Sequence, residues 1–571
     1  MNSLYNRTRG YKYNIFVIFD DPETNLSVMK FFEVAAPEDS QDAAGLKEAI
    51  ILSFKKHDLE SVTKKLVFLS SDGASVNCGS KSGLIRLFQE TQPWVSFIWC
   101  FSHRLELAIK DALNEFLEPV DTSLLHLYYL YTKSSKRYRE LKNLFKDLKD
   151  EFEMYGGGVK PVKSNGTRWI DHKVRAMGRV VEKFGLYVQH LKENIPTIKS
   201  SKDRATVQGK LNKLVDAKVL LRSAFFTDIL AEAKRFSLVS QKKNINIIKM
   251  LDAVETTKSN YQRLLAKVRK NPSSIFQLPN LKLVVDAIET DEDNEPMYQG
   301  QKVKYYSVQK RYLEDHAVHI IEKIIGCFEQ RYGNLFGEEE SHNVNVNSDE
   351  GDRILFDVTC LLNCNVWCKP GEDADEDDLY EKQLASLKNI FHRYRGMEIL
   401  ASFTEDQVVD SFLAIVRYGL KYYNMRNIDV LEFWSQILSL QDENPHWRAA
   451  LLIIEICLCA PISNASLERL FSQMNFIKSN ARNRLSNIAL NAVLRIRVSG
   501  ISIDKYHTEY VQRCVNFWYK KRIDDQTKEN GRDISSGKLA ELLRDQLLKL
   551  RTCQHPLHLR VVQIVTEGIN L

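Results

Sequence analysis

The sequence predicts an α/β segment near the N-terminus that is joined to a much larger helical part, so that the whole chain is mostly α-helical. Strand-like apolar runs occupy much of the first hundred residues, and long helical periodicity fills residues 123–424. Two further apolar helical stripes lie between residues 464 and 497. With 571 residues and 44% hydrophobic residues, the chain is long enough for several folded domains.

Strand-like and helix-like segments alternate over the first part of the chain, which argues for α/β structure there. In chain order we expect strands at 14–19 and 27–34, a helix at 42–57, a strand at 66–69, a helix at 80–90, a strand at 95–100 and a helix from Ser102. The pair of antiparallel strands, the helix and the further strand resemble part of a ribonuclease-H-like sheet. Asp20 and Asp21 fall at the turn of the first hairpin and are interpreted as turn residues.

The remainder divides by its pattern into three segments. Residues 123–425 read as a mainly helical insertion, 426–500 as an apolar helical region, and 501–571 as a basic, partly helical tail without a readable motif. Residues 1–122 are then the first part of an α/β core. The predicted domains are therefore 1–122, 123–425, 426–500 and 501–571.

Net charge and cysteine content indicate which partners the chain can contact and whether its thiols are reduced. The net charge of +6 permits contact with nucleic acid, and basic residues gather at 133–149 and 519–522. Ten cysteines without a CxxC pair indicate reduced thiols. Cys360, Cys364 and Cys368 recur every four residues, as on one face of a helix, and we expect them to pack and not to bind a metal.

The chain shows no membrane segment and no secretory signal. Its most apolar run, residues 449–462, is shorter than the ~20 residues of a span and carries Glu455. The first residues are polar and lack the apolar core of a signal peptide. We therefore expect an intracellular protein.

Two acidic residues far apart in the chain are candidates for metal-dependent chemistry. Asp72 follows a buried strand within LVFLSSDGASVN, and Glu468 lies in the first turns of a helix within APISNASLERLFS. Carboxylates from a strand end and a distant helix can share divalent metal ions for phosphoryl transfer. Whether this chain retains that chemistry is the question that the motifs raise.

Two further motifs carry residues that can bind or simply pack. Cys100 and His103 form a CxxH in CFSHRLEL, but no partner pair for a structural zinc lies nearby, so by themselves they suit a core or a helix start. Arg168 and Trp169 follow a glycine turn in NGTRW, where an aromatic ring can be partly exposed. By composition alone Trp169 is more simply a residue that anchors a helix.

The order of these motifs resembles that of the hAT superfamily of cut-and-paste DNA transposases and the cellular proteins domesticated from them. DGASVN, CFSHRLEL and NGTRW are followed by a helical insertion and then by SNASLERLFS. The matching motifs cover roughly a quarter of the chain, and the C-terminal block is the most specific. The resemblance implies a ribonuclease-H-like core that a large all-helical insertion interrupts, and a nuclear location.

The resemblance also implies roles for particular residues. The second Asp and the Glu of the family's Asp-Asp-Glu triad, which would hold Mg²⁺, fall on Asp72 and Glu468. Cys100 and His103 would help to build the core and the DNA-end site, Trp169 would handle a flipped base, and Arg168 would bind DNA beside it. The C-terminal block implies self-association as a homodimer or higher oligomer, through the residues Leu467, Leu470, Phe471, Met474 and Leu485.

One departure from the family pattern decides the expected activity. The first catalytic Asp belongs on an opening strand before the 14–19 hairpin, and the sequence shows neither that strand nor the usual N-terminal zinc finger. Two-metal chemistry needs both ions held ~3.5–4 Å apart by carboxylates, so the loss of one carboxylate should abolish most of the activity. We therefore expect a transposase-derived, dimerising protein that is able to bind DNA and is catalytically inactive.

Two alternatives stay open from the sequence. One is a protein-interaction scaffold that uses the helical insertion as its working surface, because helices with acidic loops suit partner binding as readily as DNA contact. The other is an active Mg²⁺-dependent transposase in which some other acid completes the set with Asp72 and Glu468.

Overall fold

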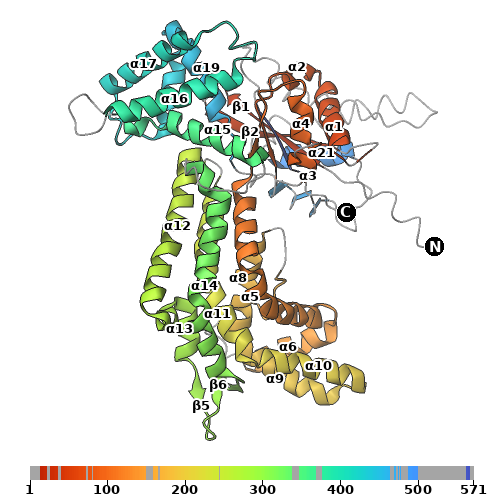
Figure 1. Cartoon of the computed structure of the whole chain (residues 1–571). Coiled ribbons are helices and arrows are strands. Elements are labelled where there is room, and N and C mark those ends of the chain that lie inside the picture. Colours follow the sequence, from red (N-terminus) through yellow and green to blue (C-terminus); the bar gives the residue numbers. More distant parts are fainter. Residues whose placement is uncertain are drawn as a thin grey trace, which may run out of the picture. The chain divides into compact units, whose positions relative to one another are not determined.

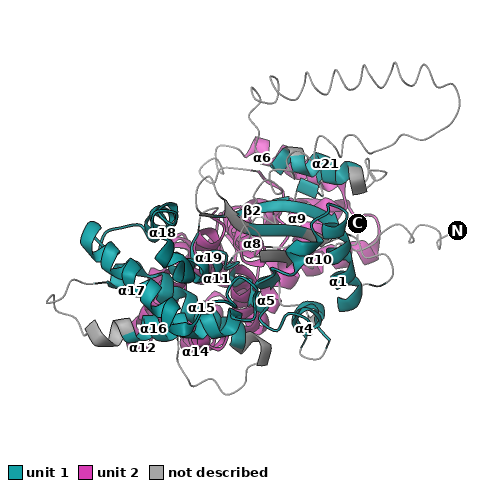
Figure 2. Ribbon diagram, turned by 90° about the horizontal axis from the view of Figure 1, so that it is seen from above, with its two compact units in different colours: residues 1–101, 243–248, 342–571 teal, residues 102–242, 249–341 magenta. Residues whose placement is uncertain are grey.

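The structure is a computed structural model of the whole chain, and it is mostly helical (Figure 1). The residues that it describes are 13–21, 26–35, 40, 42–71, 75–79, 82–148, 158–164, 168–242, 245–336, 346–367, 376–462, 469–470, 473–474, 476–477, 487–498 and 561–565. The chain divides into two compact units (Figure 2). Unit 1 comprises residues 1–101, 243–248 and 342–571, and unit 2 comprises residues 102–242 and 249–341.

Unit 1 contains a five-stranded sheet of order β2-β1-β8-β3-β4. Its strands are β1 (Tyr13–Asp21), β2 (Leu26–Ala35), β3 (Phe68–Ser71), β4 (Ser96–Trp99) and β8 (Val561–Val565). β1 is antiparallel to β2 and to β8, whereas β3 is parallel to β8 and to β4. The last strand of the chain thus lies in the middle of the sheet, between strands from the first hundred residues.

The period-two alternation of β1 sends neighbouring side chains to opposite faces of the sheet. Ile15 and Val17 pack with Leu46, Ile50 and Phe54 of helix α1 (Ala43–Lys55) on one face. Phe16, on the opposite face, packs with a second cluster that the C-terminal helical region supplies. Both faces of the sheet are therefore covered with apolar side chains.

A β-bulge in β2 places two successive residues on the α1 face. The register of β1 against β2 shifts between Ile15, paired with Glu33, and Phe16, paired with Phe31, so that Phe32 is the extra residue. Phe32 stacks on Phe54 at 4.5 Å between ring centroids. Glu33 accepts hydrogen bonds from Lys56 Nζ at 2.6 Å and from His57 Nε2 at 3.2 Å at the end of α1. The bulge thereby buries an acid beside two partners.

Helix α21 (Asn487–Val498) covers the backbone of edge strand β2. Val34 N donates to Asn491 Oδ1 at 2.7 Å, and Arg495 Nη2 donates to Phe32 O at 2.5 Å. An edge strand with unpaired backbone groups invites pairing with other chains, so these side chains protect it. The remaining helical elements of unit 1 are α2 (Glu60–Thr63), α3 (Ser75–Cys78), α4 (Leu84–Gln89), α15 (Val346–Leu362), η5 (Cys364–Val366), α16 (Glu376–Tyr394), α17 (Glu405–Tyr422), α18 (Val430–Ser439), η6 (Pro445–Trp447) and α19 (Arg448–Leu458).

Unit 2 is built from helices with one small three-stranded sheet, β5-β6-β7. Its longest helices, α5, α11, α12 and α14, run side by side in Figure 1. The elements are α5 (Phe101–Thr132), α6 (Ser135–Asp147), α8 (Trp169–Glu182), α9 (Phe184–Asn194), η2 (Ile195–Thr197), α10 (Ser201–Leu214), α11 (Ala217–Ser240), α12 (Ile247–Lys270), η3 (Pro272–Gln277), α13 (Pro279–Asp286), β5 (Glu289–Thr290), β6 (Pro296–Tyr298), β7 (Gln301–Lys302), α14 (Tyr306–Tyr332) and η4 (Gly333–Phe336).

The structure confirms the predicted strands and helices of the first hundred residues, with ends shifted by a few residues. Asp20 and Asp21, interpreted as turn residues, are instead the last two residues of β1, because they pair with Ser27 and Leu26 of β2. The predicted domain bounds also differ from the two units. Residues 102–122, expected in the α/β core, group with unit 2, and residues 342–425, expected in the helical insertion, group with unit 1. The tail contributes strand β8.

The predicted stack of three cysteines on one helix is wrong. Helix α15 ends at Leu362, and Cys364 begins the separate turn η5, whereas Cys368 lies outside the described residues. Cys364 is fully buried, and burial raises the pKa of its thiol to about 12. A buried neutral thiol is a packing group, as expected.

Within the part of the chain that the structure describes, no helix combines the length and the apolar character that crossing a bilayer requires.

Candidate functional site

The candidate site of unit 1 lies where the parallel strands β3 and β4 end. Strands β3, β4 and β8 run in one direction, so their carboxyl ends share one edge of the sheet, where ligands of such sheets bind. Cys100 N donates to Ser71 O at 3.1 Å, which extends the pairing of the two strands by one residue. Ser70 and Ser71 are buried beneath this edge.

Asp72 and Glu468, the predicted metal ligands, lie outside the described residues. Asp72 follows Ser71 directly in the sequence, whereas β8 consists of Val561, Val562, Gln563, Ile564 and Val565 and carries no carboxylate. Mg²⁺ prefers carboxylate and carbonyl oxygens. Among the described residues no three Asp, Glu, His or Cys side chains come together as a metal site.

The CxxH motif spans the start of helix α5. Cys100, the last residue before the helix, is buried and is not part of a disulfide. His103 is half-buried in the first turn, and the next residue, Arg104, is almost completely buried. Arg104 Nη1 donates to Arg331 O at 3.3 Å. Cys100 thus packs in unit 1, while His103 and Arg104 belong to unit 2.

Arg168 and Trp169 stand at the start of helix α8 in unit 2. Arg168 is the N-terminal capping position and Trp169 the first helical residue. The half-buried Trp169 ring lies 5.3 Å from Lys173 Nζ, one helical turn later, which is a cation–π contact. Lys173 in turn donates to Asp121 of α5. Sequence analysis missed Lys173 and Asp121, although the i, i+4 spacing of Trp169 and Lys173 is visible in it.

Burial shifts the pKa values of both members of the Lys173–Asp121 pair. Lys173 is 1% exposed, and removal from water lowers the pKa of its ammonium group although Asp121 opposes the shift. Removal from water also raises the pKa of Asp121, against the hydrogen bond from Lys173. The two directions agree, because desolvation disfavours the charged form of each group. The pair therefore fixes α8, and with it Trp169, against α5 at an electrostatic cost.

Of the predicted dimerisation residues, Leu470 and Met474 are described, and Leu467, Phe471 and Leu485 lie outside the described residues. Leu470 and Met474 are fully buried against Phe16 and Val34 of the sheet. Their apolar stripe thus has a partner face within unit 1. These two side chains are core residues and are not exposed to a second copy of the chain.

Other apolar residues of the same C-terminal region are exposed. Phe476 is 70% exposed, and the guanidinium of Arg497 lies 5.3 Å from its ring. Val493 and Val498, exposed by 39% and 38%, lie close to Arg497 on α21. Phe476 thus lies beside Arg497 at the end of α21, and we call the exposed apolar residues of this region, Phe476, Val493 and Val498, the Phe476 patch.

A comparison of the chain with models of known protein families found no match.

Proposed function

We propose that the chain is a transposase-derived nuclear protein of the hAT type that self-associates and binds DNA without cutting it. The order and spacing of the motifs around Asp72, Cys100, Trp169 and Glu468 carry the proposal. The observation that supports it best is the strand order β2-β1-β8-β3-β4 with its mixed directions.

The sheet suits a ribonuclease-H-like core. In the family, the opening strand that carries the first catalytic Asp comes before the hairpin and is expected to pair with the first hairpin strand. Its Asp can approach Asp72 only if the same strand also lies beside β3. The position between β1 and β3 is taken by β8. The chain therefore completes a sheet of this kind with its last strand.

The same strand supports the absence of catalysis. In the family the strand at this position carries the first catalytic Asp, whereas residues 561–565 are VVQIV. Neither valine, isoleucine nor glutamine supplies the carboxylate that holds two metal ions together. The first acid after the strand is Glu567, which lies outside the described residues.

Self-association is proposed through the Phe476 patch and not through the buried stripe. Leu470 and Met474 would have to leave the core of unit 1 to reach a partner, whereas Phe476 is already exposed. Exposed apolar side chains that lie together mark interaction surfaces. A two-fold dimer would bury this patch against its own copy.

The experiment combines light scattering after size exclusion with a DNA cleavage assay on the full chain. We expect a dimer at micromolar concentration that Phe476→Glu converts to monomer, and no cleavage of duplex DNA with Mg²⁺ or Mn²⁺. Leu283→Glu, an equally exposed apolar position in unit 2, is the matched control and should leave the dimer intact.

Two results would contradict the proposal. If the unaltered chain is a monomer at micromolar concentration, the proposed self-association is wrong. Metal-dependent cleavage that disappears in both Asp72→Ala and Glu468→Ala would instead establish an active nuclease.

A protein-interaction scaffold is the second candidate, and exposed apolar residues on unit 2 favour it. Leu283, Tyr305 and Val308 are 71%, 66% and 63% exposed around the end of α13 and the start of α14. If the chain shows no affinity for DNA even in low salt, the scaffold becomes the better hypothesis.

A further inference from the structure

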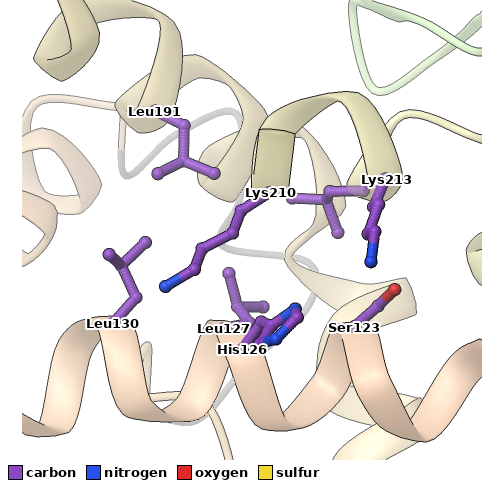
Figure 3. A pocket seen from close by; sticks show the side chains of 8 residues that line it. Ser123, His126, Leu127, Leu130, Leu191, Lys210 and Lys213 are labelled. Carbon is purple, nitrogen blue, oxygen red and sulfur yellow. The ribbon is translucent and has the colours of Figure 1, made fainter. Parts of the chain in front are cut away.

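A shallow pocket in unit 2 lies between helices α5 and α10 (Figure 3). Ser123, His126 and Leu130 line it from one face of α5, and Lys210 and Lys213, one turn apart, line it from α10. In Figure 3 the Lys210 side chain reaches across toward α5, and the amine of Lys213 points toward Ser123. Two cations and an imidazole thus meet around one small space.

The basic character of the pocket continues onto neighbouring residues. Lys133, between α5 and α6, and Arg137, in the first turn of α6, both act electrostatically on Lys210. Within the described residues, none of Lys133, Arg137, Lys210, Lys213 and His126 forms an ion pair with a carboxylate.

Glu140, an acid of the neighbouring helix α6, has other partners. Glu140 lies 3.7 Å from Lys136 Nζ and accepts a hydrogen bond from Asn194 Nδ2 at 3.0 Å. The five basic residues therefore form a cluster that has no carboxylate partner among the described residues, which we call the α5–α10 basic cluster.

Two features of the cluster suit the binding of an anion. His126 Nδ1 is buried and has no hydrogen-bond partner among the described residues. Burial, and then the charges of Lys210 and Lys213, lower the pKa of His126. Burial lowers the pKa of Lys210 as well, followed by the charges of Arg137 and Lys133. An anion in the pocket would offset the part of both pKa shifts that comes from repulsion between the positive charges.

The size of the pocket limits what it can hold. The space enclosed by the side chains is about 10 Å³, room for a single water-sized group. A free oxyanion cannot be enclosed there and would rest at the mouth, against flexible lysines. A phosphate that belongs to a longer chain fits better, because Lys133 and Arg137 can then contact further phosphates of the same backbone.

We propose that the α5–α10 basic cluster binds a phosphate of a DNA backbone, with Lys210 and Lys213 as the contacting cations and His126 as a hydrogen-bond donor. This inference rests on the proposed DNA-binding function and assigns it to particular residues. It concerns phosphate contact alone, so it predicts affinity without sequence preference.

The test measures the affinity of the full chain for a short labelled duplex of arbitrary sequence, by fluorescence anisotropy between about 50 and 200 mM salt. The variant Lys210→Gln/Lys213→Gln should bind at least ~10-fold more weakly at the lower salt, and its salt dependence should be shallower by about two ions. Lys267→Gln/Lys270→Gln is the matched control: it removes the same charge from exposed positions on α12, which does not line the pocket.

A second arm separates the two sources of phosphate. Inorganic phosphate alone is titrated into the unaltered chain and the pocket variant by calorimetry, and we expect no saturable binding at millimolar concentration. Circular dichroism and melting temperature check that the variants fold, and Lys213→Gln, at an exposed position, serves if the double variant does not.

Each other outcome overturns the assignment. If the pocket variant and the control lose DNA affinity equally, the effect comes from the lower net charge and not from the pocket. No loss in the pocket variant would place DNA elsewhere and leave the proposed function standing. No DNA binding by the unaltered chain would remove DNA binding from the proposed function too, and saturable phosphate binding in that case would make the pocket a small-anion site.

Discussion

Buried charge in the described parts of this protein is held by specific partners, and the cost of that burial is visible in the pKa values. Lys173 and Asp121 each ionise less readily than in water, because desolvation outweighs their attraction. Glu33 behaves differently: burial opposes its ionisation, but hydrogen bonds from His57 and Lys56 outweigh it and lower its pKa. The Lys173–Asp121 pair thus positions α8 against α5 but adds little stability, whereas ionised Glu33 stabilises the fold.

The Lys173–Asp121 pair can be tested by removing one or both charges. Asp121→Asn leaves a buried ammonium group without a counterion and should lower the stability of unit 2 by ~3 kcal/mol. Lys173→Met together with Asp121→Asn removes the desolvated charge and should recover most of that loss. Urea unfolding followed by circular dichroism measures both, and a double variant no more stable than Asp121→Asn would contradict this account.

Glu33 should make the stability of unit 1 depend on pH. Because its pKa is lowered in the folded chain, its stabilising effect is present above the ordinary pKa of 4.5 and is lost as pH falls through the lower folded value. Glu33→Gln should therefore be less stable than the unaltered chain near neutral pH, with the difference shrinking in acid. Urea midpoints at pH 7 and pH 3 measure this, and a difference that does not change between them would refute it.

The strands and helices of unit 1 differ in how far the sequence alone predicts them. The alternation in 14–19 and 27–34 and the apolar run 66–69 are local signals, and each became a strand. β8 was not predicted, because VVQIV is too short to separate strand from helix by periodicity and its partners lie at the other end of the chain. The bulge at Phe32 was also missed, since only pairing with β1 defines it.

The central position of β8 in the sheet can be tested with a proline substitution. Val562→Pro removes a backbone donor from a strand with neighbours on both sides, so the sheet of unit 1 should open between β1 and β3. Hydrogen exchange should rise in β1 and β3 while the helices of unit 2 keep their protection. Gly568→Pro, which lies beyond the strand in the sequence, is the control, and equal exchange in the two variants would argue against the central position of β8.

At the scale of the whole molecule, the motifs predicted which elements carry these residues better than they predicted what surrounds the side chains. Cys100 and Trp169 were expected near structural elements that the chain does form, at the end of β4 and the start of α8. The apolar stripe through Leu470 and Met474 was correctly expected to be buried, but sequence periodicity cannot say by which surface. The α5–α10 basic cluster joins residues from three helical segments, which no single stretch of sequence displays.

Metal binding by the whole chain is the remaining prediction. Since β8 offers no carboxylate beside β3, calorimetry with Mn²⁺ should show no specific binding, and Asp72→Ala should behave like the unaltered chain. Specific binding that Asp72→Ala abolishes would mean that another acid completes the site. Glu567→Gln would then be the first variant to examine.

The central position of β8 also has a consequence for how the protein is made. Asn14 pairs with Val565, so the sheet cannot close before the ribosome has released more than 550 further residues. Until then β1 and β3 keep one unpaired side each, and such edges invite association with other nascent chains. Unit 2 needs none of these residues and can fold while synthesis continues. The cell therefore meets this protein first as a finished helical body attached to an unfinished sheet, which is the kind of intermediate that chaperones protect.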